Sequence, residues 1–176
     1  MIIPSVTETI SPWADFSKIP PSVLQAAADR GTAVHKLCAR YAAGEFVVCD
    51  DNSLIGYYRG FTDWFDSMVS EVILIEERLV DDSFGYHGMP DLVVHLKSGE
   101  NALVDLKTPI TSQRLWQIQI AAYRHLVEKS GHKIDKAGSL QLSPEGKTAK
   151  MEWYEKGAQD FNVFLSALNV YRFLNS

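Results

Sequence analysis

Two aspartates and a lysine stand close together near the middle of the chain and could share one chemical task. Asp91 is followed fourteen residues later by Asp105, and Lys107 comes two residues after that. Two carboxylates placed together repel each other, and the pKa of one rises unless a cation neutralises the pair. A hard divalent ion prefers oxygen ligands, and a nearby ammonium can stabilise charge that develops on a phosphate. These residue types suit metal-dependent hydrolysis of a phosphodiester.

A hairpin is expected to bring the two aspartates together. Residues 91–96 and 102–107 are short runs rich in β-formers, and the turn between them contains Gly99. If Gly99 takes the left-handed conformation, the register sets Asp91 across from Asp105. A slip of one residue would move one aspartate to the other face of the sheet, so the pairing is an inference from the turn.

The second strand of this hairpin decides what Lys107 can reach. Residues two apart on a strand share a face, so Lys107 lies on the side of Asp105. Val104 and Leu106 point the other way, into the core. The apolar neighbours of Asp105 predict a buried carboxylate, which is rare unless the carboxylate is paired or bound to a metal.

Four short motifs lie between residues 30 and 123. They are Gly31-x-x-x-His35, Pro90-Asp91, Asp105-x-Lys107 and Gln119-x-x-x-Tyr123. In this order they resemble the signature of the PD-(D/E)XK nuclease superfamily, and in particular its RecB-like exonuclease branch with stand-alone phage-type nucleases. The resemblance implies an α/β fold with a restriction-endonuclease-like core, in which helices flank a mixed central sheet.

The resemblance also implies an activity, a deoxyribonuclease that uses Mg²⁺ or Mn²⁺. The implied metal ligands are His35, Asp91, Asp105 and the backbone carbonyl of Leu106. The implied catalytic set is Asp91, Asp105, Lys107, Gln119 and Tyr123, in which Lys107 assists the attacking water while Gln119 and Tyr123 position the substrate. An exonuclease of phage or mobile-element recombination and repair follows. Its partners would be single- or double-stranded DNA and a recombination or single-strand-binding protein.

Each of these residues also has a structural interpretation. A histidine beside an apolar helix stripe is often only packed, and Gln119 and Tyr123 could belong to an ordinary half-buried helix. Related nucleases sometimes use an additional acidic residue before the hairpin, where the candidates are Glu71, Glu76 and Glu77, with Glu76 named first. Arg114 and Arg124 could contact phosphates, although a charged helix face is usually just solvated. The remaining histidines are expected to be structural or on the surface: His87, His95, His125 and His132.

Other activities fit the same residues. A structure-selective or restriction-type endonuclease would keep the fold, and RNA hydrolysis is compatible with the motifs. A catalytically silent nucleic-acid-binding subunit would be expected to lack an acidic residue or the lysine, and all three are present.

Composition restricts the class of protein. The chain has 176 residues, 46% of them hydrophobic and 22% charged, which is ordinary for one globular domain. The two cysteines, Cys38 and Cys49, predict reduced thiols in a cytoplasmic protein and cannot hold a four-cysteine iron–sulfur cluster. No run is long enough to cross a membrane. The net charge of −5 predicts few phosphate contacts.

The expected organisation is one nuclease domain over residues 1–176. It consists of an N-terminal arm (1–20), a helical region that carries His35 (21–70), the core sheet with the Gln119 helix (71–155) and a C-terminal helix (156–176). Trp13 and Phe16 suggest that the arm is packed down. Helices are expected over 21–43, 54–69, 112–129 and 157–174, and strands over 71–76, 91–96, 102–107, 135–142 and 148–154.

Overall fold

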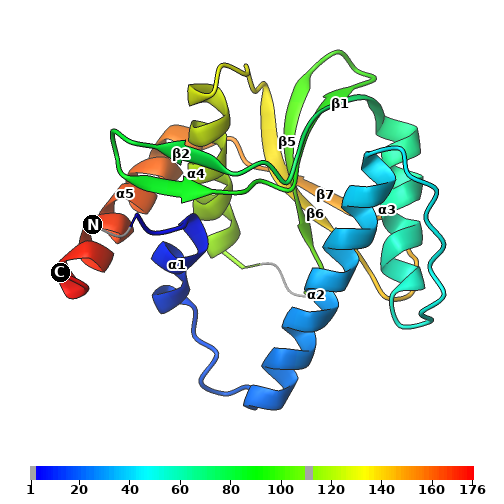
Figure 1. Cartoon of the computed structure of the whole chain (residues 1–176), viewed down its shortest axis with the longest axis horizontal. Coiled ribbons are helices and arrows are strands. Elements are labelled where there is room, and N and C mark those ends of the chain that lie inside the picture. The colour runs from blue at the N-terminus through cyan, green and yellow to red at the C-terminus, as the bar shows by residue number, and fades with distance from the viewer. Residues whose placement is uncertain (1–2, 110–112) are drawn as a thin grey trace.

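The computed structural model describes residues 3–109 and 113–176 and is built around one mixed sheet (Figure 1). Its strands lie in the order β1-β4-β5-β6-β7. β5 and β6 are parallel, and the other neighbours are antiparallel. The strands are β1 (Val69–Ile75), β4 (Leu92–Leu96), β5 (Asn101–Lys107), β6 (Lys136–Gln141) and β7 (Lys150–Trp153). The chain is therefore an α/β protein with a mixed five-stranded sheet.

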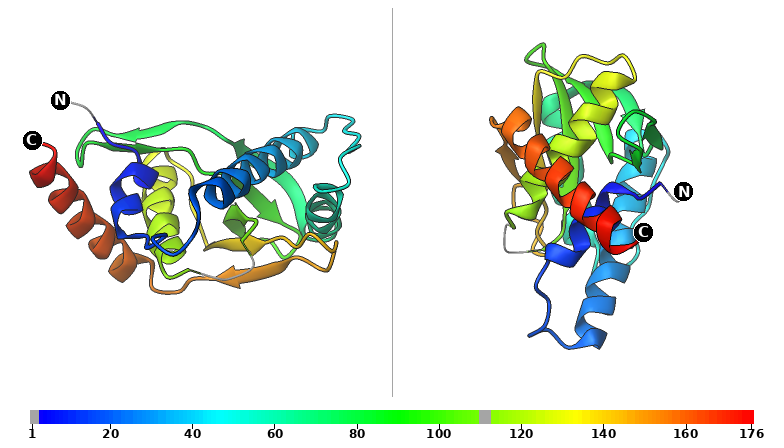
Figure 2. Two further views of the ribbon diagram at one scale, coloured as in Figure 1. Left: turned by 90° about the horizontal axis from the view of Figure 1, so that it is seen from below. Right: turned by 90° about the vertical axis from the view of Figure 1, so that its left-hand side faces the viewer.

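Helices cover both faces of this sheet (Figure 2). On one face, α2 (Pro21–Ala42) and α3 (Ile55–Met68) pack on a core that includes Val104 and Leu106. On the other face, α1 (Val6–Ile10), α4 (Leu115–Lys129) and α5 (Gly157–Leu174) pack on a core that includes Leu103. The central strand β5 is therefore apolar on both faces, so a charged residue within it needs a partner.

The β4–β5 hairpin has the predicted register. Gly99 has φ 94°, as the turn requires, and the Leu96 N–H donates to the Glu100 carbonyl over 2.9 Å. Leu92 pairs with Val104. Continued by one residue, this register places position 91, in the bend before β4, opposite position 105.

Most predicted elements are confirmed. α2 begins at Pro21, where a proline with a preset φ fits the first helical turn. β6 and β7 form the second antiparallel pair, and α5 covers the expected residues 157–174. α4 is described from Leu115, and residue 112, where the helix was predicted to begin, lies outside the described residues.

The N-terminal arm differs from the prediction. It contains α1 and the short 3₁₀ helix η1 (Ser11–Trp13), because Ser5 and Glu8 form a capping box that outweighs the nearby prolines. Trp13 and Phe16 are not packed down, since 53% and 40% of their surfaces are exposed. Val6 and Ile10 attach the arm to the core instead.

The structure also contains a second, two-stranded sheet that was not predicted. β2 (Leu79–Asp81) pairs with β3 (Tyr86–Gly88) between β1 and β4. Each of these strands has only three residues, which is too short for a period-2 pattern to be recognised. Within the described residues, no helix is long and apolar enough to span a bilayer.

Candidate active site

Asp91 connects α2 to β5 through its two carboxylate oxygens. Its Oδ2 accepts a hydrogen bond from the Leu106 N–H over 2.6 Å, and its Oδ1 lies 3.1 Å from Nδ1 of His35 on α2. One helical turn earlier, Gly31 faces Thr108, whose hydroxyl oxygen lies 3.6 Å from the place that a Cβ would take. α2 therefore passes close to the end of β5, and its histidine meets the first aspartate of the hairpin.

The pKa of His35 lies above its usual value. Burial by itself lowers this pKa, but the hydrogen bond and the negative charge of Asp91 raise it, and the charge of Asp105 adds to the effect. The imidazole therefore favours its protonated form as long as two carboxylates are its neighbours.

Asp105 is the most buried charge of the site. Only 4% of its side chain is exposed, and its Oδ2 lies 2.6 Å from Nζ of Lys107. This ammonium is close enough for an ion pair but is not aligned for a hydrogen bond, so Oδ2 is a buried carboxylate oxygen that accepts none. Burial raises the pKa of Asp105, Lys107 opposes this rise, and Asp91 adds to it.

Lys107 links β5 to α4. Its Nζ donates to Oε1 of Gln119 over 2.8 Å, and Nε2 of Gln119 donates to the hydroxyl of Tyr123 over 3.1 Å. The ammonium also lies over the Trp116 ring, 5.5 Å from its centroid. Gln119 and Tyr123 are one turn apart on α4, so both side chains lie on the face that Lys107 meets.

Tyr123 is held from several sides. Its ring lies against Gly88, where an added Cβ would stand 2.7 Å from Cε1 of the tyrosine. Burial and, to a smaller extent, the charge of Asp105 raise the pKa of Tyr123 to about 12, although hydrogen bonds with Thr7 and Gln119 oppose the rise. The phenol therefore keeps its proton at neutral pH. Sequence reasoning missed Thr7, although the capping signal Ser5-x-x-Glu8 marks its helix.

Glu76 is the acidic residue that lies beside the hairpin. It follows the last residue of β1, has φ 44°, and its N–H donates to the Asp91 carbonyl over 3.0 Å. Partial burial raises the pKa of Glu76, the charge of Asp91 raises it further, and His35 opposes this. Glu71 instead pairs with His95, farther along the sheet. The pairing of β1 with β4 singles out Glu76, and this pairing is not visible in the sequence.

The two arginine candidates lie differently. Arg124 donates to Glu128 and to the Ile134 carbonyl, so its guanidinium is engaged away from the aspartates. Arg114 is the N-cap residue of α4 and is exposed at the start of the helix that carries Gln119. The structure therefore does not bring Arg124 to the site.

The donor chemistry of the site fits a hard divalent cation. Asp91 and Asp105 supply carboxylate oxygens, and Oδ2 of Asp105 is buried without a hydrogen-bond donor. As the side chains of residues 3–109 and 113–176 stand, no three His, Cys, Asp or Glu groups are arranged to hold a metal ion. In this arrangement His35, Lys107 and the Leu106 N–H face the carboxylates.

The motif residues thus form two groups of contacts, one on either side of β5, and β5 joins the two groups. His35 and Asp91 reach it from α2 and β4, and Asp105, Lys107, Gln119 and Tyr123 run from it into α4. Carboxylates for a cation, an ammonium for an anion and a neutral phenol lie within one network. No protein-family profile matches the chain, and no curated protein matches its sequence.

Proposed function

We propose that this chain is a metal-dependent deoxyribonuclease, an exonuclease with a PD-(D/E)XK core of the RecB-like branch. The supporting observation is that the four motifs, which lie far apart in sequence, come together in one contact network. His35 meets Asp91, and Asp105 connects through Lys107 to the Gln119 helix. An ordinary packed histidine or a solvated lysine would not require this convergence.

A divalent ion is part of the proposal. Asp91, Asp105, the Leu106 carbonyl and His35 would hold Mg²⁺ or Mn²⁺, which supplies a Lewis acid and a more acidic water when bound. The protein contributes two carboxylates whose mutual repulsion a cation relieves. Oδ2 of Asp105, which lies 2.6 Å from the Lys107 ammonium, would share its negative charge between that ammonium and the ion.

Lys107 would act on the phosphate that is cleaved. In hydrolysis, a water oxygen bonds to phosphorus, the bond to the leaving oxygen breaks, and the leaving oxygen takes up a proton. Negative charge grows on the phosphoryl oxygens during this step, and a fixed ammonium stabilises it. Gln119 accepts a hydrogen bond from this ammonium and so fixes its position. Tyr123, with its pKa of about 12, would be a hydrogen-bond donor to the substrate and not a base.

The net charge of −5 opposes the binding of DNA, which is also negatively charged. Proteins that bind long DNA tightly do so through many phosphate contacts, and in this chain 22 acidic residues outnumber 17 lysines and arginines. We therefore propose modest affinity for single- or double-stranded DNA. A recombination or single-strand-binding protein of a phage or mobile element would assist delivery.

The decisive experiment uses end-labelled linear DNA, single- and double-stranded, with Mn²⁺ or Mg²⁺. We expect shortening of at least one of the two substrates with either ion and none when the ion is chelated. Failure to cleave any DNA under these conditions would contradict the proposed activity. Binding without cleavage would point to a silent nucleic-acid-binding subunit, and a parallel reaction with labelled RNA tests hydrolysis of that polymer.

A circular substrate separates the two nuclease types. An exonuclease needs a free end, so circular single-stranded DNA should stay intact while its linearised form is degraded. Cleavage of the circle would identify an endonuclease of the same fold. The linearised molecule is the matched control because it has the same sequence and length.

A further inference from the structure

α5 carries an exposed apolar stripe in addition to the apolar side that faces the core. Inward, Phe164 and Leu168 are fully buried. Outward, Val163 is 46% exposed, Val170 39% and Leu174 72%. This exposed apolar stripe lies between the buried side of α5 and a polar side that carries Asn162, Ser166 and Asn169, and an apolar stripe on a helix is normally covered.

Val163 and Val170, together with Ala167, form one wall of a groove. It has a volume of about 330 Å³ and lies between α5, the start of α4 and the N-terminal segment, with Trp13 and Leu115 in its walls. None of the described residues that line it is charged. A nucleic acid, which binds largely through its phosphates, would gain little there. The groove suits apolar side chains of another protein surface.

The spacing of the outward residues indicates which surface that is. Val163, Ala167, Val170 and Leu174 are separated by four, three and four residues, a pattern that reads the same from either end of the helix. In an antiparallel pair of α5 helices, Val163 of one copy would therefore lie opposite Leu174 of the other, and Ala167 opposite Val170. Spacings of three and four are those of helices that pack lengthwise, and a twofold axis requires a self-complementary surface.

We propose that this surface, the self-association face (Val163, Ala167, Val170 and Leu174), binds the same face of a second copy of the chain. The small side chain of Ala167 lets the two helices approach closely near the axis. Phe173, 80% exposed beside the face, would reach toward the groove of the partner.

The area is sufficient for such a dimer. The exposed fractions of Trp13, Val163, Val170, Phe173 and Leu174 correspond to roughly 500 Å² of accessible surface in each copy, since large side chains expose on the order of 150–250 Å² when free. Two copies would therefore bury on the order of 1,000 Å², near the lower limit for a specific interface. An interface of this size suits a weak and reversible dimer.

This inference does not depend on the proposed function. The self-association face lies on a different side of α5 from Phe164 and Leu168, which pack in the same core as Tyr123. The aspartates lie on the other side of that core, so dimer formation would leave them accessible. Variants on the face should therefore change association without changing DNA cleavage.

Sedimentation equilibrium over a concentration series tests the proposal. We expect the mass of the natural chain to rise from that of one copy toward that of two as the concentration approaches about 200 µM. Val170→Glu places a carboxylate near the axis of an apolar contact and should weaken association at least tenfold. Val23→Glu is the matched control, because Val23 is also an exposed helical valine but lies on α2. It should leave association unchanged.

A second variant tests the antiparallel register. The double variant Ala167→Lys with Val170→Glu would place the lysine of each copy opposite the glutamate of the other. The dimer would then contain two such ion pairs, so association should recover relative to Val170→Glu alone. Circular dichroism would establish that all variants keep their helix content. A natural chain that remains a single copy up to about 200 µM would overturn the proposal. A dimer insensitive to Val170→Glu, or one not recovered by the double variant, would do the same.

Discussion

At the scale of single residues, Lys107 has two partners that a solvent-exposed strand lysine would not have. It pairs with the buried Asp105 and donates to Gln119, and only 13% of its side chain is exposed. Holding an ammonium in this position costs side-chain entropy and desolvation. The arrangement is explained if the charge acts on an anion that enters the site.

The first prediction concerns this pair. Lys107→Ala and Asp105→Asn should each lower kcat for DNA cleavage by about 10²-fold or more, because both groups are proposed to act on charge that develops in the transition state. Single-turnover cleavage of end-labelled DNA measures the effect, and thermal unfolding shows that the fold is retained.

Lys136→Ala is the matched control for Lys107→Ala. Lys136 also lies on a central strand, pairs with Glu100 over 2.7 Å and stands over a tryptophan ring, that of Trp153. It lies outside the motif network, so its removal should leave kcat unchanged. Full activity in Lys107→Ala would place the catalytic centre elsewhere.

Tyr123→Phe is the second residue-scale prediction. Removing the hydroxyl deletes one hydrogen-bond donor but keeps the ring that packs on Gly88. We expect kcat/KM to fall roughly tenfold, the effect of losing about one hydrogen bond. Mn²⁺ affinity, measured by calorimetry, should be nearly unchanged because the phenol is not a proposed ligand. A large loss of Mn²⁺ affinity would instead assign the tyrosine to the metal site.

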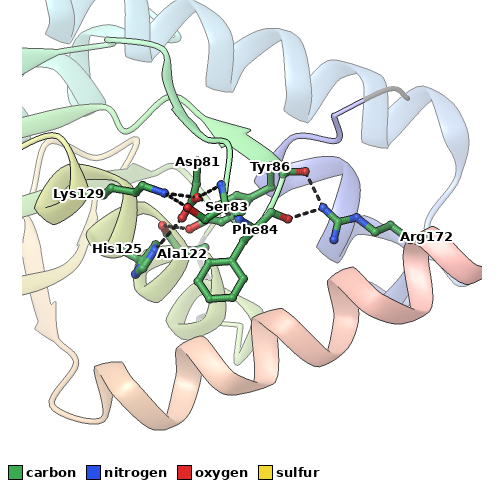
Figure 3. Close-up of polar contacts among 9 residues, drawn as sticks. Asp81, Ser83, Phe84, Tyr86, Ala122, His125, Lys129 and Arg172 are labelled. Carbon is green, nitrogen blue, oxygen red and sulfur yellow. Dashed lines mark hydrogen bonds and ion pairs between the residues drawn. The ribbon is translucent and has the colours of Figure 1, made fainter.

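At the scale of elements, the β2–β3 hairpin is fastened to α4 by one buried carboxylate (Figure 3). Asp81, whose side chain is fully buried, pairs with Lys129 and lies 2.8 Å from Nε2 of His125. Its Oδ1 also accepts the N–H groups of Ser83 and Phe84 over 2.7 and 3.0 Å. The sequence prediction that His125 is structural agrees with this position.

The same hairpin has two further attachments. The hydroxyl of Tyr86 donates to the Ala122 carbonyl over 3.1 Å inside the core. The Arg172 guanidinium, from α5, donates to the carbonyls of Phe84 and Gly85 (Figure 3). Because Gly88 of this hairpin packs on Tyr123, these attachments fix one wall of the candidate site.

The third prediction follows from the charge of Asp81. Burial alone would raise the pKa of Asp81, but hydrogen bonds from Lys129, the backbone and His125 lower it well below its ordinary value. A lowered pKa in the folded state stabilises the fold above the ordinary value of about 3.9. This stabilisation declines as the pH falls below that value and is lost as the pH passes through the lowered folded-state pKa. Asp81→Asn should therefore cost about 2 kcal/mol at pH 7, since Lys129 and His125 are partly open to solvent.

Urea unfolding at pH 7 and at about pH 3 measures this cost, and the difference from the natural chain should shrink at the lower pH. Asp82→Asn, at the exposed neighbouring residue, is the control and should change stability little at either pH. Equal costs at the two pH values would show that the carboxylate charge is not what holds the hairpin.

Sequence reasoning succeeded where local chemistry fixes local structure. The β4–β5 register followed from Gly99 and the apolar alternation, and the start of α2 from Pro21. It failed where tertiary pairing decides. The three-residue strands β2 and β3 carry little pattern of their own. Glu76 could be named as the first acidic candidate, but only the pairing of β1 with β4 shows that it lies beside Asp91.

At the scale of the whole molecule, the candidate site is a junction between the two layers of helices. Asp91 receives His35 from the α2 layer, while Asp105 faces the α4 layer through Lys107. The motifs predicted that these residues converge. Each motif is short and lies on a helix or strand whose periodicity can be recognised in the sequence. The exposed apolar residues of α5 were not predicted. The inward apolar residues alone were enough to predict an amphipathic helix there.

A site assembled from both layers should couple metal binding to global stability, which is the last prediction. A ligand that binds only the folded chain stabilises it by about 2.7 kcal/mol at a concentration 100 times its Kd. For a chain of 176 residues this corresponds to a rise in Tm of roughly 5–10 °C. Mn²⁺ should therefore raise the Tm of the natural chain by that order, and a chelator should reverse the rise.

Asp105→Asn separates specific binding from a general salt effect. The variant removes a proposed ligand and leaves an amide in its place, so Mn²⁺ should raise its Tm by much less than it raises that of the natural chain. Asp82→Asn, which changes the net charge by the same amount at an exposed position, should retain the full rise. Identical Mn²⁺ shifts in all three proteins would mean that the ion binds away from the two layers that Asp91 and Asp105 join.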